Sequence, residues 1–337
     1  MKIRSMPTKR TVRLPCGCLL VMLLLAAWVK SKGLRAQEAS GKEQSLCQPG
    51  LKGMAPGKGL AVGLSDAPLS FLHHRNGQTA GLRSQQHAYA KLRFPILLKD
   101  RFQLIGGLGY RQHGFAFRAP QDEALGYVRK PIEAQRFRQT NFKLYGALPL
   151  DARRYVKFRL KTGFSGQYAG LLASDSRFLR HSAAVLYGWK SGEDREMGFG
   201  LYASLNHDRQ TVLPAFLWNR NFKGGWGLDM LLPARAHLRY NVSPVSIVKS
   251  GIRFQQDVYA LKPGPRDAFR EFRHRYLDLE IEWEKRLARM VWLSLRGGYH
   301  YSLGSEAAIS ENHVFVGRIS DAWFLAGEFS LRLPMDR

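Results

Sequence analysis

The segment RYVKFRLKTGFSGQ, residues 154–167, alternates cations with hydrophobic side chains. Lys157, Arg159 and Lys161 share one parity, and the residues between them are apolar. Because successive side chains of a strand point to opposite faces, this segment predicts a strand with one charged and one apolar face. A soluble sheet would turn the charged face to water. A membrane barrel would instead turn the apolar face to lipid and the charged face to its lumen.

The same alternation recurs from residue 58 to the C-terminus, in runs such as HAYAKLRFPILLKD, YLDLEIEWEKR and DAWFLAGEFSLRL. The runs are about ten residues long or longer, which suits strands that cross a bilayer. No stretch shows a convincing helical period. The pattern predicts an all-β fold, a transmembrane antiparallel up-and-down barrel of about 12–14 strands over residues 58–337. A soluble, exported β-sandwich that binds a ligand is the alternative fold.

Short and long connections alternate along the chain, as in outer-membrane barrels with short periplasmic turns and longer extracellular loops. The expected short turns are Lys99-Asp100, Asp151–Arg153, Ser191–Asp194 and Glu284–Ala288. The expected long loops are Ala119–Ala134, Leu172–Arg180, Lys262–Arg270 and Gly304–His313.

The first 36 residues have the features of a signal peptide. A basic start precedes an apolar run from Leu19 to Val29, which is shorter than the roughly 20 residues of a spanning helix. We expect cleavage before Gln37, with an uncleaved anchor as the alternative, followed by a flexible exported segment at 37–57. Of the three cysteines, only Cys47 would then remain, so an intramolecular disulfide would be impossible.

The chain is strongly basic, with a formal net charge of +26. Eight of its 52 lysines and arginines lie in the expected leader, which leaves 44 against 26 acidic residues, or +18. In a cytosolic protein this charge would indicate nucleic acid, but export removes that partner. We therefore expect outer-membrane lipid, the barrel-assembly machinery and small anionic solutes as partners, in an outer-membrane location. The oligomeric state stays open.

The strand–turn rhythm and the runs LRFPILLKD, GWGLDMLLPARAHLRY and GIRFQQDVYAL carry a family resemblance. From about Pro56 to Leu333 the chain resembles uncharacterised Gram-negative outer-membrane β-barrel families, domains of unknown function with about a dozen strands. The resemblance implies the barrel architecture and no particular chemistry.

Strand parity assigns a set of charged side chains to the lumen, where a lipid-facing cation would cost about 2–4 kcal/mol near the midplane. Basic residues come mainly from the first third of the sheet and acidic ones from a late strand. Opposite charges could pair across a narrow lumen and fill it, or a basic wall could line a small porin-like channel for anionic solutes. The set is Lys91, Arg93, Arg101, Arg111, Lys143, Lys157, Arg159, Lys161, Asp278, Glu280, Glu282, Arg296, Glu328 and Arg332.

An enzyme would need a nucleophile, a base and an orienting group that converge on one face. Histidines at 73, 74, 207 and 300 and serines at 70, 204 and 302 are present, but no spacing links them. We therefore expect no catalytic, cofactor-binding or metal-binding residues and no cofactor. A lipid-modifying outer-membrane hydrolase or deacylase is the alternative function.

Overall fold

The computed structural model describes residues 46–55, 57–118, 126–133, 136–206, 209–261, 271–310 and 313–332. The expected signal peptide lies outside these residues. The described strands are β1 (Lys58–His74), β2 (Thr79–Lys99), β3 (Phe102–Phe117), β4 (Phe137–Pro149), β5 (Arg154–Gly166), β6 (Leu179–Lys190), β7 (Arg195–Asn206), β8 (Arg209–Asn221), β9 (Trp226–Leu232), β10 (Arg235–Ser243), β11 (Ser246–Ala260), β12 (Glu271–Arg286), β13 (Val291–Ser310), β14 (His313–Ile319) and β15 (Ala322–Arg332). One α-helix, α2 (Gly126–Glu133), and two short 3-10 helices, η2 (Ser176–Phe178) and η3 (Lys223–Gly225), accompany them.

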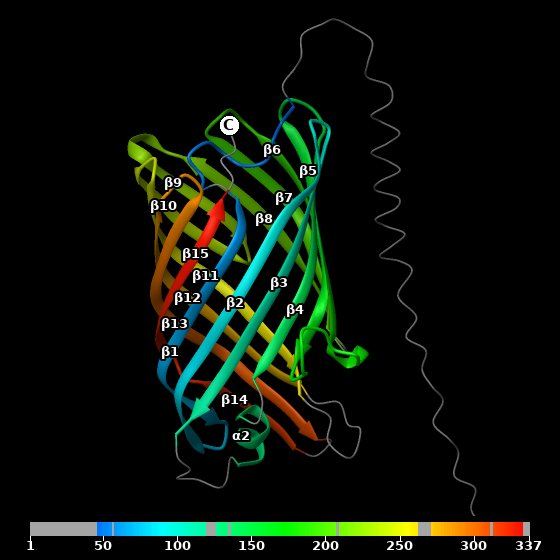
Figure 1. Cartoon of the computed structure of the whole chain (residues 1–337), viewed down its shortest axis with the longest axis vertical. Coiled ribbons are helices and arrows are strands. Elements are labelled where there is room, and N and C mark those ends of the chain that lie inside the picture. The colour runs from blue at the N-terminus through cyan, green and yellow to red at the C-terminus, as the bar shows by residue number, and fades with distance from the viewer. Residues whose placement is uncertain are drawn as a thin grey trace, which may run out of the picture. The chain divides into compact units, whose positions relative to one another are not determined.

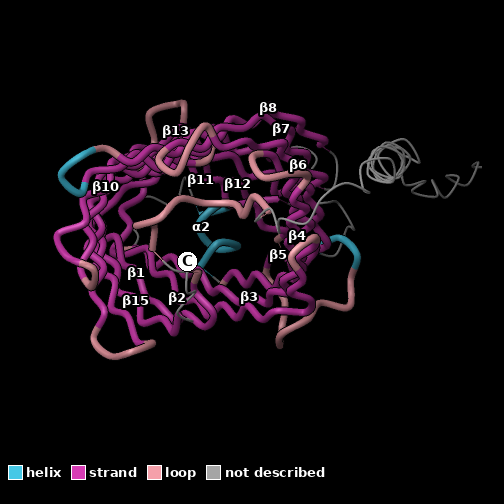
Figure 2. The backbone as a smooth tube through the Cα atoms, turned by 90° about the horizontal axis from the view of Figure 1, so that it is seen from above, coloured by secondary structure: helices cyan, strands magenta, loops and turns pink. Residues whose placement is uncertain are grey.

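The strands close into an antiparallel barrel (Figures 1 and 2). Each strand from β1 to β13 pairs with its sequence neighbour, and β15 joins β13 to β1. β14 pairs with the far ends of the same two strands, so β14 and β15 act as one wall strand interrupted at Ser320 and Asp321. The wall therefore has fourteen strands, and the predicted all-β antiparallel barrel is confirmed at the upper end of the expected count.

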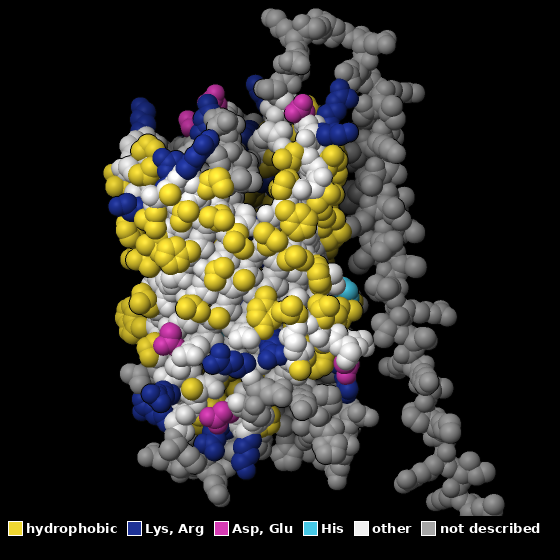
Figure 3. Space-filling model, viewed as in Figure 1, with side chains coloured by type: hydrophobic (Ala, Val, Ile, Leu, Met, Phe, Trp, Pro, Cys, Tyr) yellow, Lys and Arg dark blue, Asp and Glu magenta, His cyan; other side chains and the backbone are white. Residues whose placement is uncertain are grey.

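A belt of hydrophobic side chains crosses the face of the barrel that Figure 3 shows. Leu64, Phe199, Ile281 and Leu325 are each 59–70% exposed, which is far more apolar exposure than a soluble wall would carry. In Figure 3 the charged side chains gather above and below this belt. The surface has the pattern of a lipid-facing barrel wall. Among the described residues, no helix is long and apolar enough to cross a membrane.

The two ends of the barrel differ in their connections. One end, named here the short-turn end, holds the links at 100–101, 150–153, 191–194 and 287–290, close to the predicted positions. The opposite end, the loop end, holds α2 and the link at 167–178. Two expectations at the loop end are wrong. Gly304–His313 is not a long loop, because β13 continues to Ser310, and a helix does form at Gly126–Glu133.

Residues 46–55, part of the segment expected to be flexible, lie against the short-turn end of the barrel. Cys47 and Leu51 are buried there. The Gly50 N–H donates to Glu196 Oε1 at 2.7 Å, and Arg239 Nη1 donates to the Gly53 carbonyl at 2.7 Å. These contacts reach strands β7 and β10, so the segment is held by the inner wall at this end.

The barrel is pinched near the loop end. β5 and β11 are six positions apart in the wall, yet Ala260 of β11 pairs in parallel with Gly166 of β5. Gly166 has φ +151°, and a Cβ there would lie 2.2 Å from the Ala260 carbonyl oxygen. Only glycine therefore allows this approach. At this level the contact divides the interior into one lobe bounded by β11 to β5 through β1 and another bounded by β5 to β11.

Candidate functional site: a basic compartment beside an ion-paired lobe

Strands far apart in sequence meet through charged side chains inside the first lobe, named here the ion-paired lobe. Glu284 of β12 accepts from Arg332 Nη2 of β15 at 2.8 Å and from Lys249 Nζ of β11 at 2.8 Å. Glu284 and Arg332 are essentially fully buried. Lys58 of β1 lies 3.8 Å from Glu284 and also contacts Glu328. Glu328 and Arg332, which parity predicted for the lumen, are therefore ion-paired.

Glu280 is a second carboxylate of the same lobe with several basic neighbours. Glu280 Oε1 lies 2.6 Å from Arg253 Nη2 and 3.0 Å from His237 Nε2, and Glu280 Oε2 lies 3.6 Å from Arg296 Nε. Asp278, two residues before Glu280 on β12, contacts His300 and accepts from Gln255 Nε2 at 2.6 Å. Buried carboxylates are tolerated when they are paired in this way.

Farther toward the loop end, the interior is crossed by side chains from opposite walls. Arg111 of β3 donates to Asp257 of β11 at 3.1 Å, although these strands are not neighbours. Next to this pair, Phe115, Phe137, Tyr259 and Phe272 belong to a buried apolar cluster that also includes Ile132 of α2. The cluster closes much of this lobe at the loop end.

A different set of cations forms a basic row on β2, β4 and β5. Lys143 and Lys161 stand directly opposite each other, and Gly107 separates Lys143 from Arg93 in the same row. Within the described residues, no carboxylate lies within 4.0 Å of these three cations or of Arg159, whose guanidinium lies 5.8 Å from the centre of the Tyr202 ring. Like charges opposite each other destabilise a sheet pair.

Lys161 of this row lines a cavity of about 1000 Å³, named here the basic compartment, whose lining comes mainly from β5 to β11 and also includes residues of β3 and β4. Its charged side is formed by Lys157, Arg159, Lys161 and Arg180. Gln48 and Pro49 of the N-terminal segment also line it. Its apolar side consists mainly of Ala184, Leu186, Leu213, Ala215, Leu217, Leu231, Leu232, Pro233, Ala234, Phe254 and Val258.

The other predicted lumen residues fall into three situations. Lys157 faces the compartment and lies 3.7 Å from Glu196 Oε1, and Lys91 lies 4.1 Å from the centre of the Tyr89 ring. Glu282 lies 3.8 Å from Lys249 in the ion-paired lobe. Arg101, in contrast, lies in the exposed turn between β2 and β3 and not on the wall.

Sequence reasoning missed a histidine cluster in the ion-paired lobe. His87 and His113 are directly opposite in the β2–β3 register, and their rings stack at 3.7 Å. Ligand atoms of His87, His113 and Asp257 lie within 4.8 Å of one another. His113 has the same strand parity as Arg111, and this parity was the sequence signal that could have placed His113 inside the barrel. The stacked rings and the Arg111–Asp257 ion pair make this arrangement a poor match to a metal site.

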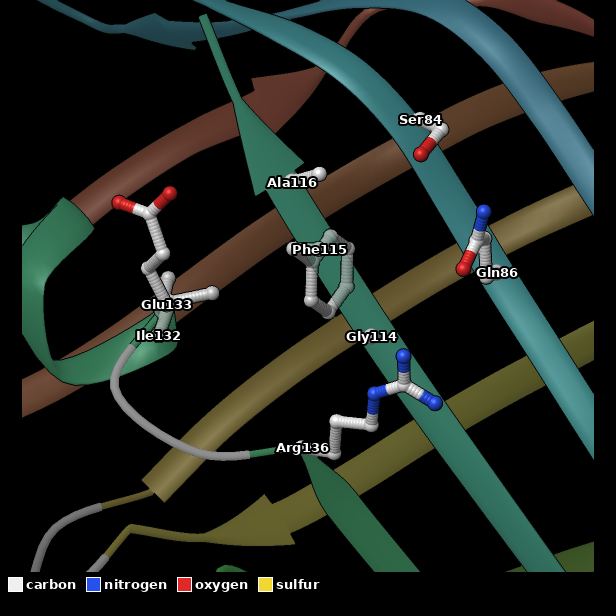
Figure 4. A pocket seen from close by; sticks show the side chains of 8 residues that line it. All are labelled: Ser84, Gln86, Gly114, Phe115, Ala116, Ile132, Glu133 and Arg136. Carbon is white, nitrogen blue, oxygen red and sulfur yellow. The ribbon is translucent and has the colours of Figure 1, made fainter.

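Among the described residues, no hydrogen bond joins a nominated serine to a nominated histidine. Ser70 Oγ accepts from Gln85 Nε2 at 3.1 Å, and Ser204 lines the basic compartment. His207 lies outside the described residues. A second, small cavity of about 140 Å³ lies between α2 and strands β2 and β3 (Figure 4). Its charged lining residues are Glu133 and Arg136.

No protein-family model and no curated protein matches the chain. Among solved structures, an outer-membrane channel from Pseudomonas putida F1 is 11% identical, with a TM-score of 0.41 over 88% of this chain and all of that one. The P. putida toluene transporter TodX is 9% identical, with a TM-score of 0.34 over 84% and 92%. The NanC porin is 8% identical, with a TM-score of 0.36 over 81% and 100%. These values describe a general likeness of barrels and do not decide what this chain carries.

Proposed function

We propose that this protein is an outer-membrane channel that admits anionic solutes through the basic compartment. The observation that carries the proposal is the basic row Arg93, Lys143 and Lys161, which has no carboxylate within 4.0 Å among the described residues. Lys161 of this row, together with Arg159, lines a cavity of about 1000 Å³. The ion-paired lobe then has a structural role, because its charges neutralise one another.

Electrostatics supports the assignment of transport to the basic compartment and of a structural role to the ion-paired lobe. Rings or rows of fixed cations in a pore favour anions, and low-dielectric walls strengthen the effect. Lys143 and Lys161 repel each other in the empty barrel, so an anion between them relieves a repulsion in addition to gaining an attraction. We expect a small conductance, because side chains fill the other lobe and residues 46–55 lie against the short-turn end.

The proposal predicts chloride selectivity that depends on two lysines. Purified protein in a planar bilayer under a KCl gradient should give a reversal potential displaced toward that of chloride. Lys143→Gln with Lys161→Gln should lose most of this displacement, since it removes two adjacent wall charges.

The control for this measurement is Lys99→Gln with Lys223→Gln. Both lysines are exposed at the short-turn end, outside the compartment, and the charge change is the same. The control should keep the selectivity of the original chain. If the barrel passes no current, or if both double variants behave alike, the channel proposal is wrong and a structural, charge-filled barrel replaces it.

A further inference from the structure

The barrel wall has a break in its hydrogen bonding beside the basic compartment. β9 and β10 are much shorter than their neighbours. Their pairing with β8 begins only at Phe216, and their pairing with β11 ends at Arg253. Toward the loop end, β8 from Arg209 to Ala215 and β11 from Phe254 onward therefore have no described strand between them.

The compartment lies directly behind this break. Leu213 and Ala215 on the β8 side, Phe254 and Val258 on the β11 side, and Ala234 at the β9–β10 turn all line the same cavity. These side chains border the break on its three sides. β11 leans away from β8 at this level, because its end pairs with Gly166 of β5. The break thus leads from the outside of the barrel into the compartment.

The break lies at the depth of the apolar belt. Val212, next to Leu213 on β8, is 65% exposed. Leu201 on β7, two residues before Ala203, the register partner of Val212, is 60% exposed. Unpaired strand edges are costly in hydrocarbon unless they line a water-filled or occupied cavity. The unpaired edges line the compartment, so water or a ligand in the compartment reduces this cost.

The compartment has cationic side chains on one side and apolar side chains on the opposite side. Arg159 and Lys161 present cations from β5, and Arg159 Nε is buried without a hydrogen-bond partner in the described structure. Leu213, Leu217 and Phe254 present hydrocarbon from β8 and β11. A small inorganic anion would satisfy the first side alone. A volume of about 1000 Å³ is large enough for a molecule with a long apolar body.

We infer that the ligand of the basic compartment is an amphipathic anion, a single alkyl chain that ends in a carboxylate or a similar head group. The head group binds at Arg159 and Lys161, and the chain packs against Leu213 and Phe254. The ligand passes between the compartment and the lipid through the break between β8 and β11. This inference rests on the proposed function and specifies the solute class of the same compartment.

The ligand class is tested with three probes on the full protein in phosphatidylcholine nanodiscs, with empty nanodiscs as the blank in calorimetric titration. Decanoate should bind, whereas decanol lacks the charge and acetate lacks the chain, so both should bind at least tenfold more weakly. Leu213→Thr should weaken decanoate binding severalfold. The matched control is Val212→Thr, one residue away on the lipid face, which should bind decanoate as the original chain does.

The outcomes separate this inference from the proposed function. Equal binding of acetate and decanoate, with chloride selectivity intact, would overturn the amphipathic ligand and leave the anion channel standing. Equal binding of decanol and decanoate would overturn the head-group assignment. If the original chain shows no chloride selectivity, the proposed function itself is contradicted.

The route through the wall is tested by the rate of binding. Ala234→Trp places a bulky side chain at the turn that borders the break and should slow decanoate association in stopped-flow fluorescence. Ala152→Trp, in an exposed turn at the short-turn end, is the control and should leave the rate unchanged. An unchanged rate in Ala234→Trp, or slowing only in Ala152→Trp, would overturn the sideways route.

Discussion

At the scale of single residues, buried charges in this barrel are stabilised by partners on distant strands. Glu284 is within 4.0 Å of Arg332, Lys249 and Lys58, from three different strands. An isolated buried carboxylate would be strongly unfavourable, but a hydrogen-bonded pair offsets most of that cost. Parity along each strand predicts an inward position for Glu284 and Arg332. It could not give the partners, because they depend on how the closed sheet is shaped.

Neutralising Glu284 should therefore destabilise the barrel. Glu284→Gln leaves Arg332 buried without its carboxylate, and we expect the free energy of unfolding to fall by about 3–5 kcal/mol. Urea titration of the refolded barrel in phospholipid vesicles measures the loss. Glu193→Gln is the control, because Glu193 and Lys52 are 80% and 67% exposed, and such pairs contribute about 0–1 kcal/mol. Losses of equal size in the two variants would contradict the account.

At the scale of strands and helices, most of the architecture was readable from alternation, because lipid on one face and water on the other impose a period of two. The sequence did not reveal α2, since its eight residues contain Pro131 and lie in a polar connection. Gly304–His313 resembled a loop in composition. Its backbone nonetheless pairs with β12 and β14, and such pairing depends on neighbours that a local pattern does not show.

The pinch between β5 and β11 also could not be predicted from the sequence. It depends on one glycine meeting one carbonyl group from a strand almost 100 residues away. The basic compartment exists because of this contact, so its apolar lining could not be predicted, although its lysine and arginine row could. Phe254 and Val258 have the parity of lipid-facing residues, and only the inward path of β11 brings them to the cavity.

Gly166→Ala should release this contact. The added methyl group would lie 2.2 Å from the Ala260 carbonyl oxygen, so β5 and β11 must separate. We expect a larger single-channel conductance, because the two lobes then merge, and a loss of unfolding free energy of about 1–3 kcal/mol. Gly327→Ala is the control, since the nearest heavy atom to its Cβ would be 3.9 Å away. An unchanged conductance in Gly166→Ala would show that the pinch does not limit the path.

At the scale of the whole molecule, the barrel is asymmetric in charge and in filling. One lobe holds ion pairs such as Glu284–Arg332 and an aromatic cluster. The other encloses most of a cavity of about 1000 Å³ lined by Arg159 and Lys161, which have no carboxylate within 4.0 Å among the described residues. Our proposal combines a filled barrel with a basic channel, because it assigns filling to the first lobe and transport to the second. Residues 46–55 contribute to the wall of the second lobe at the short-turn end.

The central claim is that solute passes through the basic compartment and not through the ion-paired lobe. Single cysteines test it in a Cys47→Ser background: Ser204→Cys lines the compartment, and Ser294→Cys lies in the ion-paired lobe beside Arg332. Current across a planar bilayer is recorded before and after a bulky thiol reagent is added. The account predicts that the reagent blocks the current of Ser204→Cys and leaves that of Ser294→Cys unchanged. Block of Ser294→Cys with no effect on Ser204→Cys would contradict it.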